Sequence, residues 1–196
     1  CQDTGTLTFY VKRGEWKESE LHRIIVEAVK EASSKIPLRP NSIDFPSKRN
    51  SGDNTGVNIP WIDIELHEKD FTEITVVLKG AGSENMSSLL MLNPKDGVNA
   101  LKRLLIDRVI KAGGKPCPPI IVGIGIGGNM ELAVHLSKYA LLRPINQRSS
   151  YEVVKNLEEE LIEEINNLRI GPMGFGGKTT TLNVAIEWAH CHTASL

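Results

Sequence analysis

The sequence predicts a single α/β domain that contains a mixed sheet, flanking helices and glycine-rich loops at strand ends. The length of 196 residues suits one ordinary domain. A hydrophobic fraction of 40% with 24% charged residues is typical of a packed globular chain. Apolar residues recur with the two-residue period of strands in some segments and with the 3.6-residue period of helices in others. These three observations predict the fold class.

The first half of the chain predicts a strand, a helix, a long loop and two further strands. Residues 6–11 alternate apolar and polar side chains, as a strand does. Residues 17–32 place apolar side chains along one helical face, namely Leu21, Ile24, Ile25, Ala28 and Val29. Prolines and glycines interrupt residues 33–60, and loops of that length are usually functional or mobile. Residues 62–67 and 73–79 then form two strands around a charged turn.

The second half predicts a buried strand among helices. Residues 119–126 are almost continuously apolar, as expected for a strand covered on both faces. The helical segments are 99–112, 129–142 and 151–168. A glycine cluster at 171–177 precedes a last strand over 181–189.

Composition excludes several classes of partner. With 23 basic and 24 acidic residues the formal charge is −1, so nothing favours nucleic acid or an anionic membrane. No apolar run approaches the roughly 20 residues that span a bilayer, and no leader pattern is seen. The three cysteines, at 1, 117 and 191, suit reduced thiols of a cytoplasmic protein. The chain starts at Cys1 without methionine and stops at Leu196 within a strand-like stretch, so we expect truncation at both ends.

Residues 123–128 satisfy the pattern G-x-G-x-x-G between a strand and a helix. A dinucleotide site requires an acidic residue about 20 positions later, where this chain has Leu-Leu-Arg-Pro-Ile-Asn-Gln at 141–147. Two alternative interpretations of this segment remain. It could bind a small anion, or its glycines could only allow a helix to pack close to a strand. This segment supports a distant alternative function, a nucleotide- or phosphate-binding module.

Gly176-Gly177-Lys178-Thr179 suggests a phosphate loop of the Walker A type. That motif requires a glycine five positions before Gly177, where this chain has Pro172. The preceding element is also a predicted helix, whereas the motif follows a strand. The spacing therefore argues against phosphate-loop hydrolysis.

An N-terminal Cys1 would suit a self-processed hydrolase that uses its own α-amine as base. Its neighbours favour another class, because Cys1-Gln2-Asp3-Thr4-Gly5 resembles the opening motif of the iron–sulfur hydro-lyases. Further motifs follow in that family's order: Pro37-Leu38-Arg39 with Asn41, Asn54-Thr55-Gly56 with Pro60-Trp61, Lys79-Gly80-Ala81-Gly82, Cys117-Pro118-Pro119, Leu142-Arg143-Pro144 and Gly171-Pro172-Met173-Gly174. The chain thus resembles, over its whole length, the α subunit of the two-subunit class I fumarase and L-tartrate dehydratase family.

The resemblance implies reversible hydration of fumarate to L-malate, with L-tartrate dehydration as the alternative. It implies a small dicarboxylate substrate, a β subunit as partner in a hetero-oligomer, and a 4Fe-4S cluster. Such a cluster, held by three thiolates, keeps one iron open as a Lewis acid for the substrate. By resemblance Cys1 and Cys117 are two ligands, and the third lies beyond Leu196. A buried thiol ahead of a core strand is the alternative for Cys117.

The resemblance also assigns the remaining site residues. Asp3 and His192 are the expected proton-transfer pair, although a turn-forming aspartate and a hydrogen-bonded strand histidine are the plainer alternatives. The expected substrate-binding residues are Gln2, Arg39, Gly80 and Ala81; Arg39 suits a carboxylate because its donors are paired, although loop arginines are usually only solvated. Counting cysteines suggests Cys191 as third ligand. If the last strand continues through residue 193, however, Cys191 and His192 point to opposite faces, and we expect Cys191 well away from Cys117.

Overall fold

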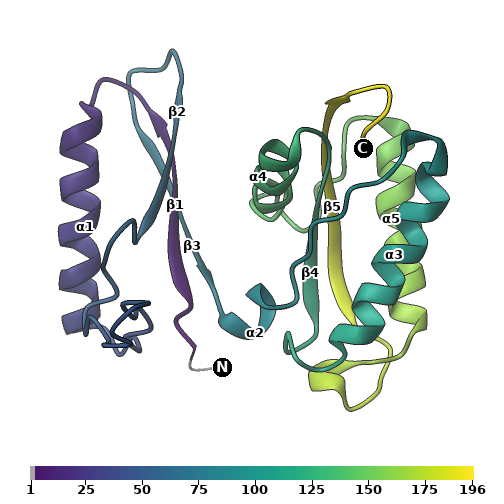
Figure 1. Cartoon of the computed structure of the whole chain (residues 1–196), viewed down its shortest axis with the longest axis horizontal. Coiled ribbons are helices and arrows are strands. Elements are labelled where there is room, and N and C mark those ends of the chain that lie inside the picture. The colour runs from purple at the N-terminus through teal and green to yellow at the C-terminus, as the bar shows by residue number, and fades with distance from the viewer. Residues whose placement is uncertain (1–2) are drawn as a thin grey trace. The chain divides into compact units, whose positions relative to one another are not determined.

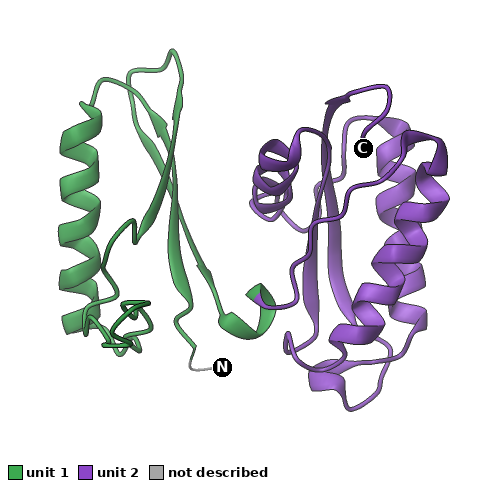
Figure 2. Ribbon diagram, in the orientation of Figure 1, with its two compact units in different colours: residues 1–84 green, residues 85–196 purple. Residues whose placement is uncertain are grey.

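The structure, a computed structural model, describes residues 3–196 and confirms the α/β class, with two sheets of which one is mixed. The chain divides into two compact units, residues 1–84 and 85–196 (Figure 2). The single domain expected from the length stays a prediction. Each unit is described by itself below.

Unit 1 is a three-stranded sheet with one helix on one face (Figure 1). Its elements are β1 (Thr6–Arg13), α1 (Glu18–Lys35), β2 (Trp61–Leu66), β3 (Glu73–Lys79) and the short helix α2 (Ala81–Glu84). The strand order is β2-β1-β3, with β1 parallel to β2 and antiparallel to β3. The central position of β1 brings the residues just before it, starting at Asp3, beside those that follow β3.

The core of unit 1 follows from two periodicities. Every second residue of β1 is buried, and every fourth residue of α1 meets that face. The buried side chains are Leu7, Phe9, Val11, Leu21, Ile25 and Val29. Pro37 follows the C-cap residue Ile36 and prevents the helix from continuing. The chain then enters the long loop that the prolines predict.

Unit 2 contains two parallel strands covered on both faces (Figure 1). Its elements are η1 (Pro94–Asp96), α3 (Gly97–Ala112), β4 (Ile120–Gly128), α4 (Met130–Ala140), α5 (Glu152–Asn167), η2 (Pro172–Gly174) and β5 (Thr181–Cys191). α4 lies on one face of β4 and β5, while α3 and α5 lie on the other. The core against α3 and α5 consists of Val109, Ile124, Leu157, Leu161, Ile165, Val184 and Ile186.

The glycines of the G-x-G-x-x-G segment have a packing role. Residues 123–128 lie within β4, which runs to Gly128, and not in a loop. A Cβ at Gly123 would collide with the Ser137 carbonyl, and one at Gly125 with the Ala133 carbonyl. Both carbonyls belong to α4, so these glycines let the helix backbone approach the strand. The Asn129 side chain already accepts from the Leu132 amide at the start of α4 (2.8 Å). Packing therefore explains the pattern without a nucleotide.

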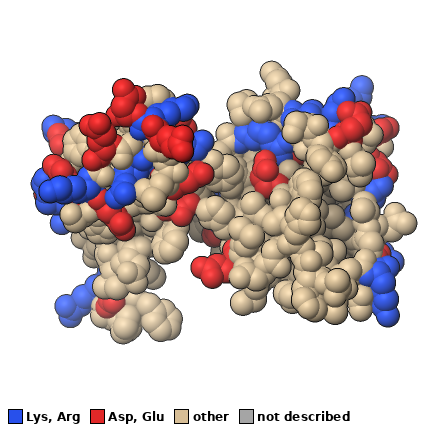
Figure 3. All heavy atoms as spheres, turned by 90° about the horizontal axis from the view of Figure 1, so that it is seen from above, with Lys and Arg blue, Asp and Glu red and all other residues tan. Residues whose placement is uncertain are grey.

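No helix in residues 3–196 is long and apolar enough to cross a membrane. On the face shown in Figure 3, acidic and basic side chains are interspersed. This mixing agrees with the formal charge of −1.

Candidate functional site

The Asp3 carboxylate lies at the centre of a polar cluster in unit 1. Its Oδ1 accepts from the Gly5 amide (2.8 Å) and from Nδ2 of Asn41 (2.9 Å). Its Oδ2 accepts from the Ala81 amide (2.6 Å). One side chain thus joins three segments that are distant in sequence. They lie before β1, in the long loop and after β3.

Gly80 leaves room for the Asp3 carboxylate beside the backbone that follows β3. A Cβ at Gly80 would lie 2.8 Å from Asp3 Oδ2. Any larger residue would therefore displace the carboxylate. The expected role of Gly80 and Ala81 was to offer amides to a substrate; in this structure the Ala81 amide donates to Asp3.

Two backbone hydrogen bonds fix the loop that carries Arg39. The Arg39 amide donates to Oγ1 of the buried Thr4 (2.8 Å), and the Asn41 amide donates to Oδ1 of Asn54 (2.7 Å). Asn54 is 1% exposed and adopts the left-handed conformation with φ of 61°, which Asn tolerates better than most residues. Its Nδ2 donates to Oγ of Ser33 on α1 (3.0 Å). The Arg39 backbone is therefore anchored on Thr4, next to Asp3 in the sequence, and the contacts that begin on α1 hold Asn41.

A cavity of about 230 Å³ opens beside this cluster. Asn41 and Gly5, which both bind Asp3, contribute to its wall, as do Asn54 and Ile59. Polar groups that converge at a cavity of small-molecule size are typical of a ligand site. We take the Asp3 cluster and this cavity as the candidate functional site.

Asp53 begins the turn that presents Asn54 and Thr55. Its Oδ1 accepts from the Thr55 hydroxyl (2.8 Å) and the Thr55 amide (3.0 Å). The Thr55 hydroxyl is the main cause that lowers the pKa of the Asp53 carboxyl below its usual range. On β1, burial raises the pKa of the Tyr10 phenol, and the nearby charges of Asp63 and Glu84 raise it further. Neither group touches Asp3, so both serve the frame of the site.

Cys117 lies in unit 2, on the loop that enters β4. Its side chain is exposed, so the alternative of a buried core thiol is wrong. Its backbone is left-handed, with φ of 58°, and its amide donates to the Gly114 carbonyl (3.0 Å). The segment containing η2 packs on this loop, because the Met173 amide donates to the Pro118 carbonyl (2.7 Å). Gly114 allows this approach, since a Cβ there would lie 2.8 Å from the Met173 carbonyl oxygen.

Cys191 and His192 lie at the other end of the same sheet. β4 and β5 are parallel, Ile120 pairs with Thr181, and Gly128 pairs with Cys191. The nine residues of β4 make eight steps of about 3.3 Å, so its two ends lie roughly 26 Å apart. Cys191 is therefore remote from Cys117, as expected. His192 is remote from Cys117 as well, although the resemblance assigns both residues to one site.

β5 ends at Cys191 and does not continue through residue 193. His192 instead pairs with Ser195 in a turn, and its Nδ1 accepts from the Ala194 amide (3.1 Å). Both side chains are exposed. The strand alternation assumed for residues 191 and 192 therefore does not decide where they point.

The donor set for a metal cluster is incomplete within the described residues. Cys1 and Gln2 lie outside them, and residues 3–196 contain no group of three His, Cys, Asp or Glu side chains that would hold a metal ion. Cys117 fits a ligand role because its thiol is exposed on a well-anchored loop. Cys191 does not fit the same cluster, since a cluster cannot bridge the length of the sheet.

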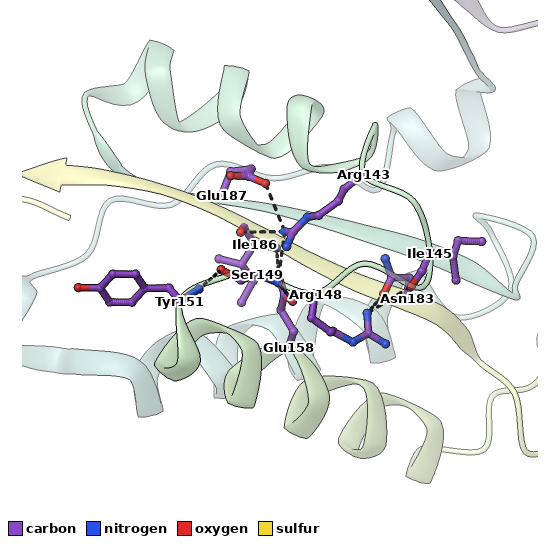
Figure 4. A network of polar contacts seen from close by, with 9 residues as sticks. All are labelled: Arg143, Ile145, Arg148, Ser149, Tyr151, Glu158, Asn183, Ile186 and Glu187. Atoms are coloured by element: carbon purple, nitrogen blue, oxygen red, sulfur yellow. Dashed lines mark hydrogen bonds and ion pairs between the residues drawn. The ribbon is translucent and has the colours of Figure 1, made fainter.

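A second polar network, which sequence reasoning missed, lies inside unit 2 (Figure 4). Glu158 is fully buried and pairs with Nη2 of Arg143 (2.8 Å). Glu158 also accepts from the amides of Ile186 (2.8 Å) and Ser149 (3.0 Å), and Arg143 donates to the Ile186 carbonyl (2.9 Å). Arg148 binds the buried Asn183 in the same network. The motif Leu142-Arg143-Pro144 was noticed, but nothing in the sequence marks its partner among the many glutamates of α5.

Comparisons with known proteins agree with the arrangement of motifs. A family model described as Fumarate hydratase (Fumerase) matches residues 1–196. A putative L(+)-tartrate dehydratase subunit alpha of Methanocaldococcus jannaschii is 49% identical over 202 residues, which cover all of this chain and 71% of that relative. The L(+)-tartrate dehydratase subunit alpha of Escherichia coli K12 is 35% identical over 199 residues. The chain spans 66% of that second relative. The family match over the whole chain decides its classification: the chain belongs to the fumarate hydratase (Fumerase) family.

Proposed function

We propose that this chain is part of the α subunit of an iron–sulfur hydro-lyase that acts on a small dicarboxylate with a β subunit. The observation that carries the proposal is the convergence of the family's motifs on the Asp3 carboxylate beside a cavity. Names of relatives supply the reaction class.

The proposed substrate is L-tartrate, with fumarate and L-malate second. Sequence reasoning placed fumarate first, but the relatives at 49% and 35% identity are named as tartrate dehydratase subunits. L-tartrate and L-malate both present two carboxylates and a hydroxyl-bearing carbon, so one pocket chemistry serves either. Assays of the αβ pair on tartrate and on malate decide the order.

In the proposed mechanism, Arg39 binds a substrate carboxylate through its paired donors. Asp3 exchanges a proton with the substrate hydroxyl from a fixed position, and Gln2 supplies an amide to the substrate. Cys1 and Cys117 would hold a 4Fe-4S cluster, which supplies a Lewis acid that makes hydroxide a better leaving group. A third thiolate and the base for the carbon acid are expected from outside this chain.

The first experiment tests the cluster. The chain and its β partner are treated anaerobically with iron and sulfide, and visible absorbance and turnover are measured. Cys117→Ser should abolish the absorbance, whereas Cys191→Ser should retain it; the two thiols are matched because both are exposed. Retained absorbance in Cys117→Ser, or its loss in Cys191→Ser alone, would contradict the ligand assignment. The chain without its partner should be inactive.

The second experiment tests substrate binding. Arg39→Lys keeps the charge but loses the paired donors. KM for the substrate should therefore rise, while the absorbance of the cluster should change little. Arg49→Lys, in the same loop, is the control and should leave KM unchanged. Loss of absorbance with an unchanged KM would contradict the role of Arg39.

The third experiment tests His192. His192→Ala should retain the cluster. A fall in turnover of about 10² to 10⁴, typical of a lost proton-transfer residue, would support a role for His192 at the site in the assembled enzyme. Unchanged turnover would remove His192 from the mechanism.

A further inference from the structure

The two oxygens of the Asp3 carboxylate have unequal surroundings. We propose that Asn41 is a positioning residue for Asp3: with the Gly5 amide it occupies Oδ1, so that Oδ2 is the oxygen presented to the substrate. This inference rests on the proposed function, because it concerns how the proton-transfer group of that site is oriented. Sequence reasoning assigned no role to Asn41.

Hydrogen-bond geometry distinguishes the two oxygens. An ionised carboxylate offers about four acceptor positions, two on each oxygen. Within residues 3–196, Oδ1 accepts two donors, at 2.8 Å from Gly5 and 2.9 Å from Asn41. Oδ2 accepts one, at 2.6 Å from Ala81. Two donors aimed at Oδ1 leave no room for a third group there, whereas Oδ2 keeps a position for a substrate hydroxyl.

The backbone around Oδ2 is shaped for the same orientation. Gly80 faces this oxygen without a side chain, and a Cβ there would lie 2.8 Å away. A half-turn of the carboxylate only exchanges two equivalent oxygens, but a partial turn about the Cβ–Cγ bond would separate the Asn41 amide from its acceptor. Asn41 therefore opposes this rotation, while Gly80 leaves space around the presented oxygen.

Asn41 is itself fixed from the far side. Its backbone amide donates to Asn54 Oδ1 (2.7 Å), and the buried Asn54 donates to Ser33 on α1. The backbone of Asn41 is therefore held in place without Asp3. A group held independently in this way restrains its partner and does not follow it.

A purely structural role for Asn41 can be separated from a positioning role. The loop is tied down by backbone amides, from Arg39 to Thr4 and from Asn41 to Asn54, and both bonds remain in Asn41→Ala. Asn50→Ala is the matched control, because Asn50 Nδ2 donates to the Pro40 carbonyl in the same loop (2.7 Å) without touching Asp3.

The test is a double-mutant cycle in the αβ enzyme with its cluster. Asn41→Ala should lower kcat about 10- to 100-fold, the factor expected for one lost hydrogen bond to a charged group, with KM changed less than about twofold. In an Asp3→Asn background, Asn41→Ala should have no further effect. Additive effects in the cycle, a raised KM with normal kcat, or an equal loss in Asn50→Ala would overturn the inference.

A second measurement needs no activity. In the ¹⁵N-labelled chain, the amide signals of Gly5 and Ala81 report the place of the Asp3 carboxylate. Asn41→Ala should shift both signals, and Asn50→Ala should shift neither; unmoved signals in Asn41→Ala would overturn the inference. Failure of the proposed function is recognised separately, as a wild-type enzyme that acts on neither tartrate nor malate.

Discussion

The two units each contain a polar network, but the networks differ in how completely their groups are used. In unit 1, Asp3 lies beside a cavity, and its Oδ2 accepts one donor from residues 3–196. In unit 2, Glu158 is fully buried, and both of its oxygens bind the Ser149 and Ile186 amides as well as Arg143. In the first network residues 3–196 leave an acceptor position on Oδ2 unfilled, and in the second the charge is enclosed in the core.

This difference teaches that charged residues in a family motif do not by themselves mark a reactive site. Arg39 and Arg143 both belong to motifs of the type Leu-Arg-Pro. Arg39 lies on a loop near the cavity-side cluster, whereas Arg143 is 10% exposed in its side chain and completes the hydrogen bonding of β5. What separates the two is whether the surrounding groups leave a position for a ligand.

The largest effect is expected where the enclosed network loses its charge. Glu158→Gln removes the fully buried carboxylate that pairs with Arg143 and leaves only that of Glu187, at 3.3 Å, so unit 2 should lose about 3 kcal/mol of stability, the lower end of the usual cost of breaking a buried pair. Urea unfolding followed by Trp188 fluorescence, in a chain with Trp16 and Trp61 replaced by Phe, measures it. Glu159→Gln, at an exposed residue, is the matched control. If the two variants are equally stable, the buried charge of Glu158 does not stabilise unit 2 as proposed.

A somewhat smaller effect is expected at the helix–strand contact of unit 2. Gly125→Ala forces a methyl group into the Ala133 carbonyl, and overpacking of this kind typically costs about 1–3 kcal/mol. The same Trp188 measurement reports it. The control is Gly52→Ala in unit 1, because a Cβ at Gly52 would have nothing within 4 Å and so would cause no crowding. The φ of 81° at Gly52 means that this control measures backbone strain alone. A Gly125→Ala variant as stable as wild type would undermine the packing explanation of the glycine pattern.

Removal of one loop anchor in unit 1 should have a smaller effect. Thr4→Val takes the acceptor from the Arg39 amide, and a lost hydrogen bond of this kind costs about 1 kcal/mol. Hydrogen exchange at the Arg39 amide should quicken in Thr4→Val. Thr6→Val, on the exposed start of β1, should leave that exchange rate unchanged; faster exchange in both variants would show that the bond to Thr4 is not what protects Arg39.

The smallest effect is expected in how the stability of the folded chain depends on pH under acidic conditions. Because the Thr55 hydroxyl lowers the pKa of Asp53 in the folded chain, the unfolded chain binds a proton at higher pH than the folded one. The stabilisation is therefore present above the unfolded pKa of about 3.9 and is lost as pH falls through the folded pKa. Asp53→Asn should flatten the pH dependence of stability below about pH 4. Asp70→Asn, at an exposed residue, is the control. If it flattens the pH dependence of stability as much as Asp53→Asn does, that pH dependence cannot be assigned to Asp53.

Periodicity predicted the elements well, because each unit buries regular apolar faces. The expected strand at 73–79 and the strand start at Thr6 agree with β3 and β1, and the other elements differ by a few residues at their ends. The loop of residues 33–60 was also predicted, since proline and glycine act locally. The boundary after Glu84 was not, because no proline-rich linker or change in composition marks it.

The candidate site was predicted in part. Asp3, Arg39, Gly80 and Ala81 come together in unit 1 as their motifs suggest. The contribution of Asn41 was missed because a single asparagine carries no periodic signal, and its partner Asp3 is 38 residues away. The separation of Cys117 from His192 was also missed, since it depends on the parallel pairing of β4 with β5.

The enclosed network of unit 2 has a consequence for association between chains. An open strand edge offers backbone groups that pair readily with another molecule and lead to aggregates. On β5, Glu158 and Arg143 already bind the amide and carbonyl of Ile186, and Asn166 binds the amides of Thr180 and Thr181. A neighbouring strand would have to displace these side chains before it could pair. The network thus protects that edge against intermolecular sheet growth without a further strand.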